Sequence, residues 1–434
     1  MKDEYIPKLF KSFGLGREYW LYLRAFKKTR PHQFAVIKIS GGTLAEKAQI
    51  VAEDLAFLSK LGLCPIVVHG GGRQIDSALA KKGLKSKKAA GARVTDEASM
   101  EIVAKVLGRL TASLVKSVNA NGGKAVDANP LHLVSAVKAA RVKGTDLGLV
   151  GRVESVDANR LRSICEAGGI PILASIGWSA GGPLNINADA LAKEIVLRVQ
   201  PRKFILVTEA GGVMDKAGNL ISEIDVQSDL PNLAANGTVD GGMLLKLEEM
   251  KCLLEMARPT VVEICSAESL LEELFTVKGS GTFIRRGANF AVSRAFDGLN
   301  TRRITALLEA SFGKKLVPGY FSHPVESVIL ERNYDAIAVV KKVRGFPYLD
   351  KFSVAKGAQG NGLGKALWRE VQKLYPRLVW RASQDNAVNS WYFKNCCGCQ
   401  RNGGWIVFWR NVGPSKALGV VSAVASLPPT LVRK

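Results

Sequence analysis

Two lysines and one arginine lie beside glycine-rich turns in the first part of this 434-residue chain. Lys38 precedes a Ser-Gly-Gly turn, and Lys246 follows a Gly-Gly pair. Cations at such places can offset the charge on a phosphoryl group during its transfer. Arg93 can hold a substrate carboxylate through two parallel hydrogen bonds. These residue types indicate phosphoryl transfer involving a small acidic substrate.

The turns themselves favour phosphate binding. Residues 40–42 and 69–72 read Ser-Gly-Gly and His-Gly-Gly-Gly, and each turn follows a short apolar run. Glycine lets backbone N–H groups approach an anion closely, and a helix that follows adds the positive end of its dipole. The chain lacks the Gly-x-x-x-x-Gly-Lys-Ser/Thr pattern, so this cradle differs from a P-loop.

A second cradle of a different kind lies far along the chain. Residues 359–364 read Gln-Gly-Asn-Gly-Leu-Gly. A dinucleotide-binding turn is one interpretation, with Asp385 as the ribose contact. Such a turn directly follows its strand, whereas residues 356–359 intervene here after the strand-like run that ends at Val354. The context therefore favours another phosphate-bearing ligand, and the chain is predicted to hold two.

A polar segment opens a helical pattern at Asn185-Ile186-Asn187-Ala188-Asp189. In a purely structural interpretation, Asn187 caps the helix and Asp189 complements its dipole. The nearby glycines and lysines favour a functional interpretation as well.

The elements that must position these residues alternate between apolar β-rich runs and longer helical patterns. Alternation of this kind predicts a largely parallel sheet covered by helices on both faces, with ligands at the carboxyl ends of the strands. The expected strands are 35–39, 66–68, 172–176, 204–208 and 260–264, and the expected helices are 45–61, 73–82, 95–118, 157–167, 188–196 and 242–256.

The pattern changes near residue 299, so the sequence predicts a second, smaller α/β unit. Its expected helices are 301–310, 364–374 and 389–394, and its expected strands are 327–331, 336–342, 348–354, 378–382 and 405–409. We expect an N-terminal helical arm (1–33), a first domain (34–284), a linker (285–298), a second domain (299–413) and a loose C-terminal tail (414–434).

Composition limits the class of protein. The formal net charge of +23 calls for anionic partners, but no long basic tail is present, so nucleic-acid binding is only a remote alternative. Seven cysteines without a signal peptide, and no apolar run near the roughly 20 residues of a membrane span, predict a soluble cytoplasmic protein. Cys396, Cys397 and Cys399 could bind a metal, but no second cysteine pair or histidine lies near them, so no metal site is predicted.

The first part of the sequence resembles the amino acid kinase family, and within it the acetylglutamate kinases. The matching motifs are Lys38-x-Ser40-Gly41, Val68-His69-Gly70-Gly71-Gly72, Arg93-Val94-Thr95, Asn185-x-Asn187-Ala188-Asp189, Thr208-x-x-Gly211-Gly212-Val213 and Gly241-Gly242-Met243-x-x-Lys246-Leu247. The resemblance implies phosphorylation of the side-chain carboxylate of N-acetylglutamate by ATP, with Mg²⁺ on the nucleotide.

The resemblance also implies a role for each matched residue. Lys38 and Lys246 would stabilise the transferring phosphoryl group, and Asp189 would orient both lysines. Backbone N–H groups of the cradle would bind phosphate or the attacking carboxylate, and two side chains would hold the rest of the substrate. The N–H donors are Gly41, Gly70 and Gly71, and the side chains are Arg93 and Asn185.

Two positions depart from the pattern of the resembled kinases. Glu209-Ala210 replaces an Asp-Val pair that often lies near the nucleotide, and Ser40 stands where glycine is common. These departures bear on nucleotide affinity more than on the chemistry.

The second part resembles the GNAT-type acetyltransferase domain of N-acetylglutamate synthases. The resemblance rests on a Tyr-Leu-Asp-Lys-Phe box at 348–352, the Gln-x-x-Gly-x-Gly loop, and a Trp-Tyr-Phe box at 391–393. It implies that the loop binds the pyrophosphate of acetyl-CoA. The implied loop residues are Gln359, Gly360, Gly362 and Gly364.

The same resemblance implies a glutamate and thioester site, at which Tyr392 could protonate the leaving thiolate. Its residues would be Lys314, Tyr348, Arg381, Asn386 and Tyr392. Placement of Tyr348 and Tyr392 in an aromatic core is the structural alternative. Ser383 stands where an arginine is common, so one carboxylate contact is missing or comes from elsewhere.

Together the two resemblances predict an enzyme for two consecutive steps of arginine biosynthesis, with glutamate and N-acetylglutamate as substrates. A monofunctional enzyme with one regulatory domain is the alternative. We also expect a homo-oligomer and a possible arginine effector, and neither nucleic-acid nor membrane partners.

Overall fold

The computed structural model describes residues 26, 29–84, 88–89, 92–141, 145–239, 241–256, 261–275, 279–359, 362–386 and 388–432. The chain forms two compact units, Met1–Gly287 and Ala288–Lys434. Of the N-terminal helical arm expected over 1–33, Phe26 and residues 29–33 are described, and the rest lies outside the described residues, as does Gly360 of the predicted loop.

An eight-stranded sheet forms the centre of the first unit, in the order β12-β14-β13-β11-β1-β2-β8-β5. Neighbouring strands are parallel except for the pair β13 and β14. The strands are β1 (Ala35–Ile39), β2 (Ile66–His69), β5 (Ala125–Asp127), β8 (Ile170–Ala174), β11 (Lys203–Val207), β12 (Glu223–Asp225), β13 (Val261–Cys265) and β14 (Thr282–Arg285).

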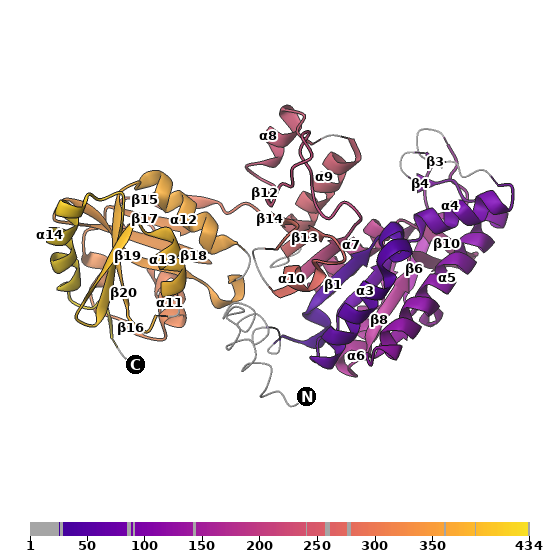
Figure 1. Ribbon diagram of the computed structural model, residues 1–434, viewed down its shortest axis with the longest axis horizontal. Helices are drawn as coiled ribbons and strands as arrows, with labels where there is room; N and C mark the ends of the chain where they lie inside the picture. Colours follow the sequence, from indigo (N-terminus) through magenta and orange to yellow (C-terminus); the bar gives the residue numbers. More distant parts are fainter. Residues whose placement is uncertain are drawn as a thin grey trace. The chain divides into compact units, whose positions relative to one another are not determined.

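Both faces of this sheet are buried, which explains why its central strands are continuous apolar runs. Alternate residues of β1 point into different hydrophobic clusters: Val36 joins the cluster under α6, α7 and α9, and Ile37 joins the cluster under α3, α5 and α10. Figure 1 shows helices along the sheet. They are α3 (Gly41–Lys60), α5 (Glu97–Ala120), α6 (Ala158–Glu166), α7 (Ala188–Val199), α9 (Gly241–Met256) and α10 (Leu270–Phe275).

Shorter elements complete the first unit. Strands β6 (Val134–Lys138), β7 (Val150–Val156), β9 (Ile176–Ser179) and β10 (Gly182–Ile186) form a small closed barrel, which the sequence patterns did not predict. The others are α4 (Gly72–Lys81), α8 (Leu230–Ala235), the two-stranded sheet of β3 (Lys88–Ala89) and β4 (Ala92–Arg93), and the 3-10 turns η1 (Pro31–Gln33) and η2 (Asn129–Leu131).

The second unit contains a seven-stranded sheet in the order β15-β17-β18-β19-β20-β22-β21. Its neighbours are antiparallel except for β19 and β20, which are parallel and pair at only two positions. The strands are β15 (Phe290–Ser293), β17 (Ser327–Glu331), β18 (Ala336–Val343), β19 (Phe346–Val354), β20 (Leu378–Ser383), β21 (Gly398–Asn402) and β22 (Trp405–Arg410). Strand β15 lies within the segment expected to be a linker.

Helices again cover both faces of the second sheet. Helix α12 packs on one face, and helices α11 and α14 pack on the other. The remaining elements are α11 (Thr301–Phe312), β16 (Lys315–Leu316), η3 (Tyr320–Ser322), η4 (Lys356–Ala358), α12 (Leu363–Leu374), α13 (Asn389–Asn395), α14 (Pro414–Ala425) and β23 (Leu431–Val432).

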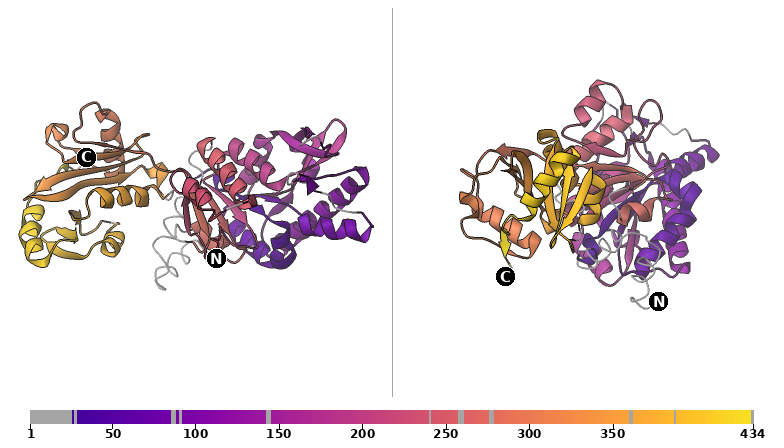
Figure 2. Two further views of the ribbon diagram at one scale, coloured as in Figure 1. Left: turned by 90° about the horizontal axis from the view of Figure 1, so that it is seen from above. Right: turned by 60° about the vertical axis from the view of Figure 1, so that its left-hand side comes forward.

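The expectation of a loose segment after residue 413 is wrong for the described residues. Helix α14, yellow in Figure 2, buries Val420, Val421 and Val424 against the sheet. Strand β23 then pairs with β16. The apolar residues of α14 recur at a helical spacing that places them against the sheet, so this segment is a packed helix.

The α/β architecture predicted from the sequence is confirmed, and the expected helices and strands differ from the observed ones mainly at their ends. The largest change is at the first helix, which begins at Gly41 because Ser40 caps it by accepting a hydrogen bond from the Thr43 N–H. The glycine turn is therefore the first turn of a helix.

Candidate active sites

The first candidate site lies at the carboxyl ends of three neighbouring strands. Ile39 of β1 is in register with His69 of β2 and with Val207 of β11. The residues that follow these strands, Ser40, Gly70 and Thr208, are therefore brought to one edge of the sheet. This is the edge at which parallel α/β sheets bind ligands.

Lys38 and Asp189 form an ion pair at this edge. The Nζ atom of Lys38 lies 2.7 Å from Oδ1 of Asp189, and the Lys38 side chain is 10% exposed. Asn187 caps helix α7 by accepting the N–H groups of Asp189 and Ala190. The capping interpretation is thus right for Asn187, while the carboxylate of Asp189 pairs with Lys38 of strand β1.

The two glycine turns touch each other. A Cβ atom on Gly41 would lie 2.8 Å from the Gly72 nitrogen and 2.9 Å from the Gly71 Cα. Gln74 also donates to the Gly41 carbonyl oxygen at 2.7 Å. Only glycine at position 41 allows this approach, which places the N-termini of α3 and α4 side by side.

The Gly70 N–H has a different partner from the predicted one. It donates to the carbonyl oxygen of Ile39 at 3.2 Å, so it ties the two turns together. His69 is also structural: its Nε2 atom lies 2.7 Å from Thr111 Oγ1, and burial lowers the pKa of its imidazole. The N–H groups of Gly41 and Gly71 remain the predicted phosphate donors.

The predicted substrate-binding residues Arg93 and Asn185 meet at Thr95. Asn185 donates to Thr95 Oγ1 at 3.1 Å, and that hydroxyl donates to the Arg93 carbonyl oxygen at 2.8 Å. The Arg93 guanidinium is buried and pairs with Asp76. Asp76, which the sequence analysis missed, supplies a carboxylate of the kind that Arg93 was predicted to bind.

Lys246 lies in the second turn of α9 and is half-buried. Across the part of the chain that the structure describes, no ion pair joins it to Asp189. The predicted orientation of both lysines by Asp189 is therefore observed for Lys38 only.

Glu209 and Ser40, the two departures from the family pattern, contact each other. The Ser40 hydroxyl donates to Glu209 Oε2 at 2.6 Å, and Arg73 Nη2 lies 3.6 Å from Glu209 Oε1. Burial alone would raise the pKa of Glu209, but the hydrogen bond from Ser40 and the charges of Arg73 and Lys38 lower it below its ordinary value. A carboxylate thus lies beside the predicted phosphate cradle.

The second candidate site begins where β19 ends. The side-chain amide of Gln359 donates to the Val354 carbonyl oxygen at 3.2 Å, which turns the loop back over the strand end. Gly362 has a φ of 71° and is the residue before helix α12. A left-handed conformation there favours glycine, and the helix N-terminus that follows suits a phosphate ligand.

Tyr348 and Tyr392 are both buried, but they lie in different hydrophobic clusters. Tyr348 packs with Val421 of α14 and its neighbours, and Tyr392 packs with Trp380 and Phe408. Burial is the main cause that raises the pKa of both hydroxyls above the ordinary value. Both tyrosines therefore stay protonated and able to donate.

Arg381, which was predicted to line the glutamate and thioester site, has structural partners. Its guanidinium donates to the carbonyl oxygens of Val424, Ala425 and Leu427 at 2.8–3.0 Å and to that of Pro428 at 3.1 Å. It also lies 4.2 Å from the centre of the Trp405 ring. Arg381 thus holds the end of α14, and binding a substrate carboxylate would need a rearrangement.

Lys314 and Asn386 both lie near Asp385: the charge of Lys314 acts on the Asp385 carboxylate, and Asn386 is the next residue in the chain. Lys314 is exposed, and its charge adds to the hydrogen bond from Ser383 in lowering the pKa of Asp385. Asn386 Oδ1 accepts the Val388 N–H at 3.0 Å, which forms the turn before α13. Asn386 therefore has a structural role whatever else it binds.

A pocket of about 380 Å³ lies beside Tyr348, and the sequence analysis did not assign it. Its lining includes the buried carboxylate of Asp350. The Oδ2 atom of Asp350 accepts hydrogen bonds from the Tyr320 hydroxyl at 2.7 Å and from Lys351 Nζ at 3.0 Å, and Lys341 Nζ lies 3.4 Å from the same oxygen. The Tyr-Leu-Asp-Lys-Phe box contains Asp350 and Lys351, so this motif was the sequence signal that could have indicated the pocket. The C-terminal residues Leu427, Pro428 and Thr430 line the same pocket.

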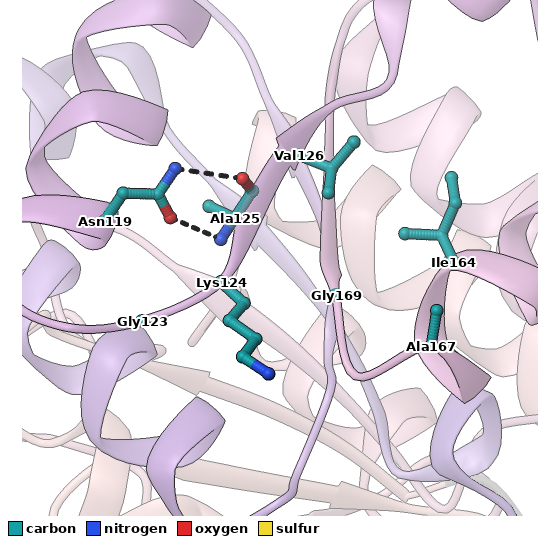
Figure 3. A pocket seen from close by; sticks show the side chains of 8 residues that line it. All are labelled: Asn119, Gly123, Lys124, Ala125, Val126, Ile164, Ala167 and Gly169. Carbon is teal, nitrogen blue, oxygen red and sulfur yellow. Dashed lines mark hydrogen bonds between the residues drawn. The ribbon is translucent and has the colours of Figure 1, made fainter.

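Another pocket, of about 490 Å³, lies at the β5 edge of the first sheet, away from the predicted site residues (Figure 3). Asn119 spans its wall by accepting the Ala125 N–H at 2.7 Å and donating to the Ala125 carbonyl oxygen at 3.1 Å. This side chain therefore takes the place of a neighbouring strand.

Two features are absent from the described residues. None of the helices they form is long and apolar enough to cross a membrane. Nor do their His, Cys, Asp and Glu side chains gather in groups of three or more that could hold a metal ion.

Comparisons with known proteins identify a family for each of the two units. The profile of the amino acid kinase family matches residues 33–263, and that of the N-acetyltransferase of N-acetylglutamate synthase matches residues 291–425. An acetylglutamate kinase of Xanthomonas campestris pv. campestris is 35% identical, over 96% of this chain and 99% of that protein.

Two further relatives show how the similarity is divided. An acetylglutamate kinase of Nitrobacter winogradskyi is 39% identical but covers 58% of this chain and 90% of that protein, so it matches about the length of one unit. The structure of N-acetylglutamate synthase from Neisseria gonorrhoeae has a TM-score of 0.66 at 22% identity, over 91% of this chain and 98% of that one. The chain therefore belongs to the amino acid kinase family, among the acetylglutamate kinases, and carries at its C-terminal end the acetyltransferase domain of N-acetylglutamate synthases.

Proposed function

We propose that this chain is a bifunctional enzyme of arginine biosynthesis. Its second domain would transfer the acetyl group of acetyl-CoA to glutamate, and its first domain would phosphorylate the resulting N-acetylglutamate with ATP. The observation that carries the kinase assignment is the Lys38–Asp189 ion pair beside the two touching glycine turns.

In the kinase reaction, a side-chain carboxylate oxygen of N-acetylglutamate attacks the γ-phosphorus of ATP. A new O–P bond forms, the bond to the β-phosphate oxygen breaks, and ADP leaves. No general base is needed because the nucleophile is already an anion. Lys38 and Lys246 would offset the charge on the phosphoryl oxygens, and Gly41 and Gly71 would donate N–H groups to them.

Mg²⁺ would accompany the nucleotide as part of the substrate. Asp189 is a carboxylate at this edge, and carboxylate oxygens suit a hard cation. Because Asp189 is already paired with Lys38, the phosphates and water would supply most of the Mg²⁺ ligands.

In the acetyl transfer, the free amine of glutamate attacks the thioester carbonyl carbon. An amide bond forms as the nitrogen gives up one proton to water, the C–S bond breaks, and the thiolate leaves and takes a proton. Gln359, Gly362 and Gly364 would hold the pyrophosphate of the cofactor at the N-terminus of α12. Tyr392, protonated in its apolar surroundings, would supply the proton to the sulfur.

Two assays on one preparation test this proposal. ADP release is measured with N-acetylglutamate and ATP, and free thiol release is measured with glutamate and acetyl-CoA. We expect Lys38→Met to abolish the first activity and leave the second, and Tyr392→Phe to do the reverse. Each variant is the control for the other, and loss of both activities in either variant would contradict the separate assignments.

A kinase with a regulatory second domain is the other candidate, and the position of Arg381 favours it. This arginine is occupied by backbone carbonyls of the C-terminal segment, and Ser383 replaces the second arginine of the family pattern. Absence of thiol release at saturating glutamate, with ADP release intact, would identify that enzyme.

We also propose that the chain forms a homo-oligomer whose activity responds to arginine. A solved N-acetylglutamate synthase from Neisseria gonorrhoeae was crystallised with coenzyme A and L-arginine, which supports a test of this ligand. Light scattering with and without arginine, combined with both assays, would measure the two properties together.

A further inference from the structure

Glu209 lies over the first turn of helix α3, in the space above a glycine. A Cβ atom on Gly42 would lie 1.5 Å from Glu209 Oε1 and 2.4 Å from its carboxyl carbon. The carboxylate therefore rests against the backbone of the 40–42 turn. That place at a helix N-terminus attracts an anion, and phosphate is the anion that this turn was predicted to bind.

The carboxylate is held there by specific contacts. Ser40 donates a hydrogen bond of 2.6 Å to Oε2, and the positive charges of Lys38 and Arg73 help to keep Glu209 ionised. Ser40 and Glu209 follow the neighbouring strands β1 and β11. The sheet therefore fixes the distance between them, and the contact is part of the fold.

Arg73 is a second cation near the Glu209 carboxylate. Arg73 is 60% exposed, its Nη1 atom contacts Glu46 at 2.6 Å, and its Nη2 atom lies 3.6 Å from Glu209 Oε1. The Glu209 side chain is 34% exposed, so it can swing outward. An outward movement would bring it closer to the guanidinium, which compensates its charge when it leaves the turn.

We propose that Glu209 occupies the phosphate position of the 40–42 turn in the nucleotide-free protein and is displaced toward Arg73 when ATP binds. This inference rests on the proposed kinase function and adds to it a residue that sets nucleotide affinity. Glu209 acts as an internal competitor: each ATP that binds must first break its contact with Ser40 and remove its charge from the turn. The competitor makes binding selective for polyanionic phosphates over weaker anions.

The experiment is a titration of the full-length protein with ATP by calorimetry, in the presence of coenzyme A so that the second predicted phosphate loop is filled. Glu209→Gln keeps the shape of the side chain and can still accept from Ser40, but it removes the charge. We expect the Kd for ATP to fall about ten-fold, which corresponds to about 1.4 kcal/mol. The Kd for tripolyphosphate should fall by a similar factor in Glu209→Gln. The Kd for adenosine should not change, because adenosine lacks the phosphates.

Two further variants make the test specific. Glu46→Gln removes a carboxylate from the same arginine but not from the turn, so it should leave the Kd for ATP unchanged. Ser40→Gly removes the hydrogen bond that holds Glu209, while glycine remains an acceptable N-cap, so it should tighten ATP binding by a smaller factor.

Three results would overturn the inference. The first is that Glu209→Gln binds ATP as tightly as wild type or more weakly. If the weaker binding occurs only when Mg²⁺ is present, Glu209 is a metal ligand instead. The second is an equal gain for adenosine. The third is that neither the wild-type protein nor Glu209→Gln binds ATP, which would also refute the proposed kinase function. Binding by wild type without a change in the variant refutes the competitor alone.

Discussion

Lys38 Nζ lies 2.7 Å from Asp189 Oδ1, although one residue is in the central strand β1 and the other opens helix α7. The lysine is almost fully buried at the end of the strand, and a buried charge requires a partner. The sheet and the helix thus fix a cation at the strand end where a phosphoryl group would pass. The pair links stability to the proposed catalysis.

We therefore predict that Asp189→Asn lowers the kcat of ADP release by about 10²–10³-fold, because Lys38 loses the group that orients it. The KM should change less, since the glycine turns still bind the phosphates. The free energy of unfolding should fall by about 1–3 kcal/mol, because the buried ammonium keeps only a neutral partner.

Glu194→Gln is the matched control for this prediction. Glu194 lies on the same helix and has a distant pair with Arg198 at 4.0 Å. Its variant should keep both kcat and stability. A similar loss of kcat in both variants would mean that the helix, and not the ion pair, is responsible.

The contact between the glycine turns gives a second prediction. Gly41→Ala places a methyl group within 3 Å of backbone atoms of Gly71 and Gly72, which cannot move aside as a flexible side chain would. We expect a loss of about 1–3 kcal/mol in the free energy of unfolding and a large loss of ATP binding.

Gly72→Ala is the control, because a Cβ atom there would have no neighbour within 4 Å. Denaturant unfolding should show a stability within about 0.5 kcal/mol of wild type for this variant. Alanine has a higher helix propensity than glycine, so helix propensity alone would not destabilise either variant. Equal destabilisation by both substitutions would therefore contradict the assignment of the loss to the approach of the two turns.

The sequence was sufficient to predict the architecture and the location of the first site. Strand ends followed by glycine turns are local patterns, and parallel sheets bring such ends together, so the positions of Lys38, Gly41 and Gly71 followed from topology. The barrel of β6, β7, β9 and β10 was missed because its short strands alternate only weakly, and because two of its pairings, β10 with β7 and β6 with β9, join segments that are far apart in the sequence.

The partners of the charged residues could not be predicted in the same way. Arg93 and Arg381 were assigned to substrate, yet one pairs with Asp76 and the other with carbonyls of the C-terminal segment. Both partners are determined by tertiary packing of helices that the residue pattern does not relate to each other. The contact between Ser40 and Glu209 was hidden for the same reason, although each had been noticed singly as unusual.

The bonds of Arg381 lead to a third prediction. Arg381→Gln removes donors to four carbonyl oxygens at the end of α14 and leaves them at the C-terminal end of a helix without a cation. We expect the free energy of unfolding of the second domain to fall by about 2–4 kcal/mol. The fluorescence of Trp405, which lies under the guanidinium, should change as well.

Truncation after Gly413 separates the two possible roles of Arg381. It removes α14 and β23, exposes the apolar surface that Val420 and Val424 cover, and frees the guanidinium. If Arg381 serves only the fold, truncation and Arg381→Gln should lower thermal stability together and leave ADP release unchanged. If glutamate binding improves in the truncated protein, the C-terminal segment competes with the substrate for this arginine.

The last prediction concerns Asp54, a half-buried carboxyl group on α3. Burial, together with the charge of Glu53, raises the pKa of Asp54 from its ordinary value of 3.8 to about 7. The unfolded chain releases this proton near pH 4 and the folded chain near pH 7. The stability that protonated Asp54 confers is therefore complete below about pH 4 and is lost as the pH rises through 7.

Asp54→Asn removes the titration and should stabilise the protein only where the wild-type carboxylate is ionised. We expect no change in Tm at pH 4 and an increase of several degrees at pH 8, which corresponds to about 1–2 kcal/mol after allowance for water at a half-buried group. Glu53→Gln leaves the main cause, burial, in place and should have a smaller effect. Scanning calorimetry at both pH values measures the difference, and an equal gain at pH 4 and pH 8 would show that the asparagine acts through packing or helix propensity and not through the pKa of Asp54.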